Sequence, residues 1–509
     1  MGENTPGKIR IVYASTVNFA ALLYRLIAAL VFTIAVARKL SVTDFAAYGV
    51  ILSLSYFLSS IPTLWIYWSA RWSLWGRREA GGTGLWLTLA TTALLTPLYI
   101  GASWLVSEAS GLSMSKLLLG ITIMYLDSLN RYILGFLNTA KPESTGAARF
   151  IYETTRILLG YMLIVEMKQA LRGAIAVYDA AYIISIAYGV YILARLGLFT
   201  LAFNTGIAKE LLRGARVTVF GTLSGMLRYF TRSYISIVTG SDLAVAYYNL
   251  GVSTEGPIVN ASGASTSALY ASLLRESSGN SITLSIRVFL FFTGFLASVY
   301  IFLAKPIASL FNPAYLDAWP LIITLAVYGI TAGLAGVYSS SLMGLDREDK
   351  ESFKASWGSL SSWVFRLNFK LLLAAYAIST PLLYLYRSNP LAAAESFALS
   401  LLATSIARLA LTYRAASRML PHELPWRELA GLLVGSILSG FYYKLSGATG
   451  IVVSSFWKQA PLLLIHIGVG AALFYTVFLV LSPWSRLLIR AVLSRLGLRG
   501  HLDDLPDHC

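Results

Sequence analysis

The sequence predicts an all-α polytopic membrane protein, and two observations carry this prediction. Of the 509 residues, 57% are hydrophobic and only 13% are charged, and the mean hydropathy is +0.67. Soluble domains have roughly 25% charged residues. The apolar residues also gather into runs of the ~20 residues that a helix needs to cross the ~30 Å core of a bilayer. Backbone polar groups must be paired within hydrocarbon, so each run is expected to be helical.

About fourteen apolar runs are predicted to be membrane spans. In chain order they cover approximately residues 11–37, 44–68, 84–106, 117–138, 147–166, 173–194, 217–238, 243–270, 284–304, 318–344, 358–385, 391–413, 428–446 and 459–482. The connections between them are short, so no separate soluble domain is expected. The run at 358–385 is the most polar at its start, where it carries Arg366 and Lys370.

Basic residues in the predicted loops indicate the orientation. The loops on the N-terminal side of the bundle carry most of the Lys and Arg residues, including Arg71, Arg77 and Arg78. Such loops stay in the cytoplasm, so we expect a multi-pass protein of the cell (plasma) membrane with both termini cytoplasmic. Topology also explains the formal net charge of +16, and no nucleic-acid partner is expected.

A weak internal similarity predicts the domain organisation. The turn LSVTDFAAYG (40–49) superposes on TGSDLAVAYY (239–248) after a shift of 199 residues. This favours two pseudo-symmetric six-helix lobes, and related repeats place the substrate path of transporters at the lobe interface. The predicted division is an N-terminal lobe at 1–200, a C-terminal lobe at 201–427, an appended helix pair at 428–482 and a basic, polar cytoplasmic tail at 483–509.

Three stretches of the chain resemble a known family. They are RKLSVTDFAAYGVILSLSYF (38–57), KELLRGARVTVFGTLSGMLRYFTRSYISIVTGSDLAVAYYNLG (209–251) and KPIASLFNPAYLDAWPLI (305–322). In order and spacing they resemble the fourteen-span polysaccharide/oligosaccharidyl-lipid flippases, a branch of the multidrug/oligosaccharidyl-lipid/polysaccharide exporter (MOP) superfamily. The resemblance implies two six-helix lobes around a central cationic cavity, alternating access and a lipid-linked sugar substrate. Family members commonly have an aspartate in the seventh span; this chain reads Thr231-Arg232-Ser233 there, which puts an ion-coupling role at that position in doubt.

Three arginines are predicted to lie inside spans without an acidic partner on their own helix: Arg25, Arg228 and Arg232. A cation at the bilayer centre costs at least ~2.5–3.5 kcal/mol unless it faces protein or water. Two interpretations are open. Glu255 on the next span could pair with Arg228 and Arg232, or the arginines could line a cavity that binds a phosphate or pyrophosphate group. Arginine suits phosphate because its planar guanidinium binds two oxygens and stays charged.

Further candidates adjoin these residues. Tyr24 and Tyr229 could stack on sugar rings, although tyrosines also form belts at membrane interfaces. Four other charged residues form pairs on one helical face and are secondary cavity candidates: Asp127 with Arg131, and Glu153 with Arg156. Each pair could equally be a self-neutralised structural contact.

These observations predict a flippase that moves a polyprenyl-phosphate or pyrophosphate oligosaccharide from the inner to the outer leaflet. We expect it to act as a monomer among membrane lipids. The alternatives are a multidrug-type cation antiporter, which needs acidic cavity groups, and a membrane glycosyltransferase or polymerase, which needs a large catalytic loop. An enzyme is not expected, and neither is a cofactor or metal, because the sequence has no Walker loop, no HExxH motif and no cluster of Cys and His.

Overall fold

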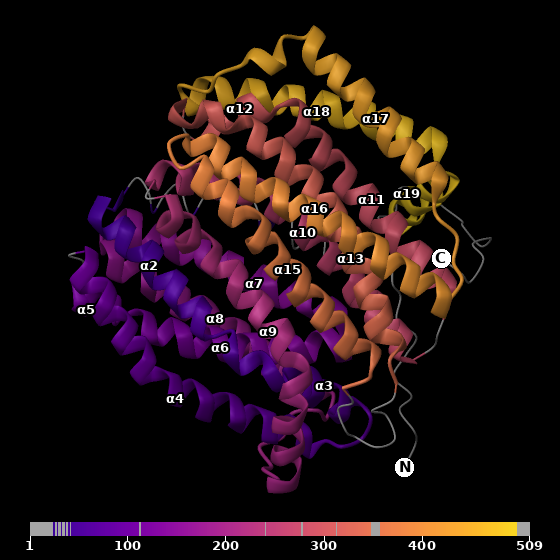
Figure 1. Cartoon of the computed structure of the whole chain (residues 1–509). Coiled ribbons are helices and arrows are strands. Elements are labelled where there is room, and N and C mark those ends of the chain that lie inside the picture. Colours follow the sequence, from indigo (N-terminus) through magenta and orange to yellow (C-terminus); the bar gives the residue numbers. More distant parts are fainter. Residues whose placement is uncertain are drawn as a thin grey trace.

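The computed structural model describes most of the chain between residues 24 and 495. The residues outside the described part are 1–23, 26–27, 29–31, 33–35, 37–38, 41, 111–112, 240, 276–277, 312, 348–356 and 496–509, together with some helical side chains, among them that of Arg232. Every regular element within the described part is a helix (Figure 1). The architecture is therefore the predicted all-α polytopic membrane fold.

The first group of helices corresponds to the predicted spans between 44 and 194. It consists of α2 (Val42–Leu58), η1 (Ile61–Trp65), α3 (Ile66–Leu74), α4 (Glu79–Ser110), α5 (Met114–Leu117), α6 (Gly120–Ala140), α7 (Pro142–Gly160), the π-helical turn η2 (Tyr161–Glu166) and α8 (Ala170–Arg195). Helix α7 begins five residues before the predicted limit, because the fixed φ of Pro142 suits the first helical position.

The second group corresponds to the predicted spans between 217 and 413. It consists of α9 (Thr205–Thr239), α10 (Asp242–Arg275), α11 (Gly279–Phe302), α12 (Ala304–Phe311), η3 (Pro313–Ala318), α13 (Trp319–Leu345), α15 (Leu360–Leu385) and α16 (Pro390–Met419). The start of α16 follows from its sequence, since Pro390 takes the first helical position and Asn389 Oδ1 accepts a hydrogen bond from Ala392 N at 3.1 Å. The polar run at 358–385 is helical as predicted, as α15.

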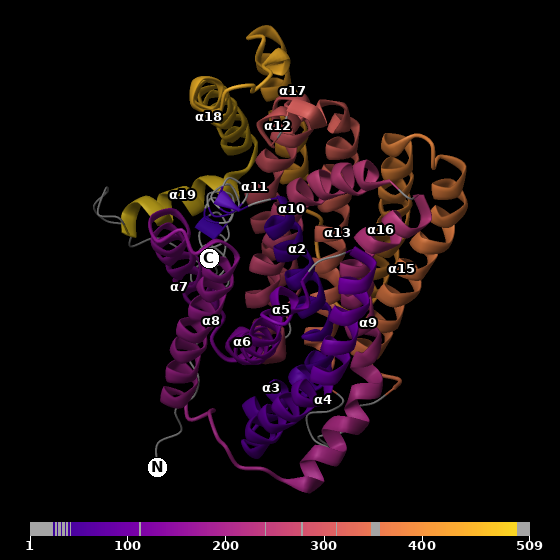
Figure 2. The same ribbon diagram turned by 90° about the vertical axis from the view of Figure 1, so that its left-hand side faces the viewer.

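The third group follows α16 along the chain and packs on the outer side of α11 and α12 (Figures 1 and 2). It consists of α17 (Trp426–Leu445), η4 (Ala448–Gly450), α18 (Phe456–Leu481) and α19 (Pro483–Arg495). Residues 483–495, expected to belong to a polar tail, are therefore helical. This segment has the amphipathic period of a surface helix: Trp484 and Leu488 are buried, whereas Arg486 and Arg490 are exposed.

Nine helices of the described part are long and apolar enough to cross a membrane. Four other long helices, α7, α9, α10 and α17, are more polar and do not meet that criterion. Helix α10 makes most of its contacts with α13, α11, α16 and α9. A polar helix is tolerated at membrane depth when other helices surround it.

Each of the first two helix groups has a hydrophobic core, and a further cluster joins buried residues of the first group to Ile207, Leu211 and Val217 of α9. Buried residues of α2, α6 and α8 form one cluster around Tyr178 and Ile123. Buried residues of α10, α13 and α16 form another around Tyr328 and Phe397. Helix α9 of the second group borders the first group, since it contacts α15 of its own group and η1 and α4 of the first (Figure 1). The predicted span at 11–37 lies largely outside the described residues, although Arg25, Ala28 and Phe32 are helical.

Candidate functional site

Glu153 binds two arginines in the first helix group. Its Oε1 lies 3.3 Å from Arg25 Nε, and its Oε2 lies 2.8 Å from Arg156 Nη2. Helix α7 places Glu153 and Arg156 three residues apart on one face, so this predicted pair forms. The partner of Arg25 therefore comes from another helix. The Glu153 side chain is 1% exposed, whereas that of Arg25 is 46% exposed.

Aromatic rings surround this cluster. The Arg156 guanidinium lies 5.0 Å from the centre of the Phe32 ring and 5.5 Å from that of Tyr178, which favours the charged form through cation–π attraction. Tyr24 lies beside the cluster, where its hydroxyl hydrogen-bonds to Thr154 Oγ1 at 3.0 Å. Its ring packs against Phe150 at 4.3 Å between centres, so Tyr24 is engaged within the protein.

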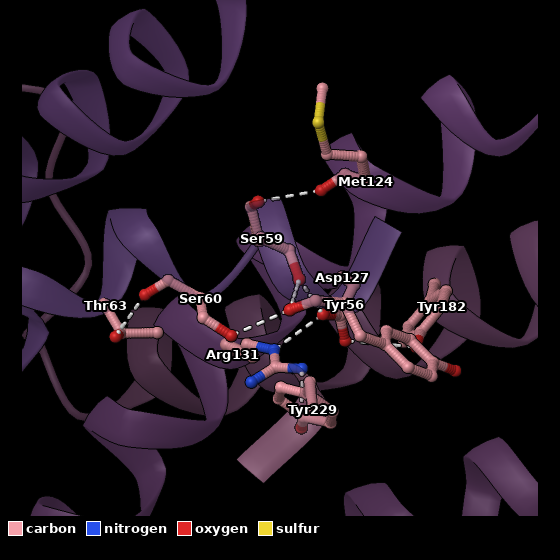
Figure 3. A network of polar contacts seen from close by, with 10 residues as sticks. Tyr56, Ser59, Ser60, Thr63, Met124, Asp127, Arg131, Tyr182 and Tyr229 are labelled. Carbon is pink, nitrogen blue, oxygen red and sulfur yellow. Dashed lines mark hydrogen bonds and ion pairs between the residues drawn. The ribbon is translucent and has the colours of Figure 1, made fainter. Parts of the chain in front are cut away.

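Asp127 on α6 is the centre of a second cluster (Figure 3). Its Oδ2 accepts hydrogen bonds from Arg131 Nε at 2.6 Å and from Ser59 Oγ at 2.5 Å, and its Oδ1 accepts one from Tyr182 Oη at 3.1 Å. The predicted i,i+4 pair therefore forms. Its carboxylate is bonded by Arg131 of α6, by Tyr182 of α8 and by Ser59, which directly follows α2. The Asp127 side chain is 7% exposed against 27% for Arg131.

Tyr229 connects this cluster to α9. Arg131 Nη2 donates to Tyr229 Oη at 3.3 Å, and the Arg131 guanidinium lies 5.8 Å from the Tyr229 ring centre and 5.9 Å from that of Tyr56 (Figure 3). The side chains of α2, α6 and α9 thus meet at Arg131.

Arg228 precedes Tyr229 on α9, and its side chain contacts α13 of the second helix group rather than the first group. Its Nη2 donates a hydrogen bond to the hydroxyl of Tyr328 on α13. Tyr328 is buried, but the Arg228 side chain is exposed. Both residues lie well inside their helices, so an exposed cation here must face water or protein groups rather than acyl chains.

Glu255 on α10 is buried and lies near enough to Arg228 for electrostatic attraction. Among the described residues, however, no ion pair within 4.0 Å joins Arg228 to Glu255. Arg408 on α16 is near enough to repel Arg228 and donates to Ser339 Oγ at 3.2 Å. The predicted position of Arg232 on α9 is described, but its side chain lies outside the described part.

The three clusters share one arrangement of charge. In each, the carboxylate is buried and the arginine is the more exposed group: Glu153 with Arg25, Asp127 with Arg131, and Glu255 with Arg228. In the Glu153 cluster, Arg156 is the exception, because its side chain is only 9% exposed. Such an arrangement attracts anions.

Sequence reasoning missed most partners of these charges. Ser59, Tyr182 and Tyr328 complete the clusters, but a lone Ser or Tyr in an apolar run carries no signal of its contacts. Arg71 was assigned to a loop, yet it is 0% exposed and packed between helices. Among the described residues, no group of three or more His, Cys, Asp or Glu side chains could hold a metal ion.

Comparison with solved structures identifies the fold. A MATE transporter in the straight conformation superposes with a TM-score of 0.62 at 14% identity, over 81% of this chain and 97% of that one. A MOP superfamily transporter from Pyrococcus furiosus gives 0.57 at 15% identity, over 81% and 97%. This chain has the MATE transporter fold.

Another solved structure has the same fold, whereas the comparisons of sequence gave no match. An outward-facing multidrug resistance MATE family transporter of the MOP superfamily shares that fold, with a TM-score of 0.58 at 16% identity over 80% of this chain and 95% of that one. No protein-family model matches the sequence, and the comparison with curated proteins gave no match.

Proposed function

We propose that the protein is an alternating-access flippase for a lipid-linked oligosaccharide with a phosphate or pyrophosphate group. The observation that carries the proposal is the shared arrangement in which arginine is exposed and carboxylate is buried. A guanidinium can replace the water that a phosphate loses on leaving the membrane surface, because it donates two parallel hydrogen bonds and stays charged. The MATE fold and the resemblance to polysaccharide-export flippases support the same proposal.

In this mechanism, the headgroup and glycan enter the space between the helix groups while the polyprenyl tail stays in the bilayer. We expect Arg228 of α9 and Arg131 of α6 to reach that space and contact the phosphate, because both side chains are at least partly exposed. Arg25 and Arg232 are further candidates. Tyr229 follows Arg228 on α9 and accepts a hydrogen bond from Arg131, so we expect it to contact a sugar ring next to the phosphate.

Flipping by the purified protein tests the proposal. In proteoliposomes that contain a fluorescent polyprenyl-pyrophosphate oligosaccharide, Arg228→Gln is expected to lower the flipping rate by about tenfold or more, which corresponds to about 1.4 kcal/mol. Arg228→Lys keeps the charge but not the planar fork, so an intermediate rate is expected. The triple change Arg25→Gln, Arg228→Gln and Arg232→Gln should abolish flipping.

A matched control removes an arginine outside the clusters. Arg387 is exposed in the turn between α15 and α16, with its guanidinium 4.8 Å from the Tyr384 ring centre. Arg387→Gln should leave the flipping rate within about twofold of the unmodified protein. An unchanged rate in Arg228→Gln, with the protein still folded, would refute the role of this arginine.

The alternative is a multidrug-type cation antiporter, which the MATE fold also suits. One of the similar structures is a multidrug resistance transporter. An antiporter for organic cations needs acidic groups that reach the ligand, whereas Glu153, Asp127 and Glu255 lie buried behind arginines. Export of a fluorescent organic cation from the same proteoliposomes, without flipping of the glycan lipid, would favour the antiporter.

A further inference from the structure

Arg71 is the most completely buried arginine of the described part and lies where the two helix groups meet. It belongs to α3, in the first group, and is 0% exposed. Its Nη1 donates to Tyr270 Oη on α10 at 3.2 Å and to the Met343 carbonyl on α13 at 3.1 Å. Its Nη2 donates to the Asp346 carbonyl at 2.5 Å, just after α13 ends. One side chain of the first group thus binds two helices of the second.

Tyr67 extends this contact to α15. It lies one turn before Arg71 on α3, and Arg71 Nη1 donates to its hydroxyl at 2.8 Å. The same hydroxyl hydrogen-bonds to Ser361 Oγ at 2.6 Å, and the Tyr67 ring packs edge-on against Phe365 at 5.6 Å. Asp346 completes the arrangement, since its Oδ2 accepts from Ser361 N at 2.8 Å. The contact therefore joins α3 to the last turns of α10 and α13 and to the first turn of α15.

The opposite end of the bundle is held differently. There, Lys116 Nζ lies 2.7 Å from Asp44 Oδ1, and Thr122 Oγ1 donates to Asp179 Oδ2 at 2.8 Å. Both of these contacts lie within the first helix group. Polar contacts between α3 and the second group gather instead at the end where α10 and α13 finish. The two groups can separate at one end only after the contacts of Arg71 break.

We propose that Arg71 is a reversible latch that closes this end of the transporter between its two access states. The inference rests on the proposed alternating access. Each hydrogen bond of the guanidinium can be replaced by water when the groups separate, so the latch can open without leaving a buried, unpaired charge. Because the latch is closed here, the structure is the state in which this end of the path is shut.

Accessibility of a buried cysteine tests the latch. The chain has a single cysteine, so Cys509→Ser gives a background without thiols. Ser361 is 0% exposed beside Tyr67 and Asp346, and Ser361→Cys places one thiol inside the closed contact. In detergent, a membrane-impermeant maleimide should label this thiol slowly, and adding Arg71→Gln should raise the labelling rate by about tenfold or more. Tyr67→Phe removes one hydroxyl and should give a smaller rise.

The control changes an arginine at the same end that stays within one helix group. Arg347 Nη2 donates to the Leu273 carbonyl at 2.8 Å, from the end of α13 to α10. Arg347→Gln should leave the labelling rate of the Ser361→Cys thiol unchanged. Equal labelling with and without Arg71→Gln, or an equal rise with Arg347→Gln, would overturn the latch.

Two measurements separate this result from misfolding and from the proposed function. If Arg71→Gln unfolds the protein, Arg71→Lys is used instead, because Lys keeps the charge but cannot bond as many acceptors. The latch is overturned if the labelling rate of the Ser361→Cys thiol does not rise in whichever variant is folded. Labelling requires no substrate. If Arg71→Gln raises the labelling rate tenfold but the unmodified protein flips no glycan lipid, the latch is supported and the flippase is refuted. If the protein flips the glycan lipid but Arg71→Gln does not raise the labelling rate, the flippase is supported and the latch is refuted.

Discussion

At the scale of single residues, the charged groups of this protein work in sets rather than in isolated pairs. Glu153 binds Arg25 and Arg156, and Asp127 accepts hydrogen bonds from Arg131, Ser59 and Tyr182. A buried carboxylate costs several kcal/mol unless its oxygens are paired. The ion pairs and hydrogen bonds supply these partners, and within the sets Arg25 and Arg131 are partly exposed whereas Arg156 is buried.

Removing the shared carboxylate should destabilise the protein more than removing one of its partners. Glu153→Gln leaves Arg156, whose side chain is 9% exposed, without its counter-charge. We expect a loss of about 3 kcal/mol in the free energy of unfolding, measured by denaturation in detergent. Arg25→Gln is the control, because it preserves the Glu153–Arg156 pair and removes a half-exposed cation; its loss should be below about 1 kcal/mol. Equal losses would contradict the central role of Glu153.

At the scale of helices, close packing at small residues decides how α17 and α18 dock. A Cβ at Gly470 of α18 would lie 1.9 Å from the hydroxyl of Tyr443 of α17, and a Cβ at Gly435 of α17 would lie 3.0 Å from the Phe474 ring. Lipid tails are as apolar as leucine, so helices in a membrane associate through such close contacts rather than through the hydrophobic effect. Buried Glu428 adds a polar contact, since its Oε1 accepts from Ser482 Oγ at 2.7 Å.

One substitution pair on α18 measures this packing. Gly470→Ala forces Tyr443, which is 0% exposed, to move, and over-packing of this kind costs about 1–3 kcal/mol. Gly468, two residues earlier, has nothing within 4 Å of its ideal Cβ. Gly468→Ala should therefore be neutral or stabilise α18 by up to about 1 kcal/mol. Thermal unfolding in detergent checks both, and a Gly470→Ala protein as stable as Gly468→Ala would contradict the packing argument.

At the scale of the whole molecule, the first two helix groups meet along α9, the helix of the second group that contacts η1 and α4 of the first. Arg131 bonds Tyr229 of α9 and Arg228 bonds Tyr328 of α13, while Arg71 joins the two groups at one end. If the proposed alternating access holds, these arginines make the path cationic and Arg71 closes one end of it.

The membrane potential should act on the proposed substrate. Moving one charge through 100 mV changes its free energy by about 2.3 kcal/mol. If a pyrophosphate headgroup crosses with its charge only partly neutralised by arginines, a potential that is positive on the receiving side should speed flipping in proteoliposomes. A potassium gradient with valinomycin sets the potential, and reversing its sign should slow the transfer. Rates that do not depend on the potential would mean that the arginines neutralise the headgroup fully.

The sequence by itself determined the helical membrane class, because hydropathy over ~20 residues is a local property. Nine helices of the described part meet the length and hydropathy criterion for a span, whereas the predicted spans at 147–166, 217–238, 243–270 and 428–446 correspond to more polar helices that do not. It also determined the pairs Asp127–Arg131 and Glu153–Arg156, since residues three or four apart share a helical face. Only the tertiary structure decided that Arg25 shares Glu153, that Arg228 binds Tyr328 rather than forming an ion pair with Glu255, and that Arg71 lies between the helix groups instead of in a loop. Those contacts join residues that lie 100 or more positions apart, and they depend on how whole helices cross, which no local pattern specifies.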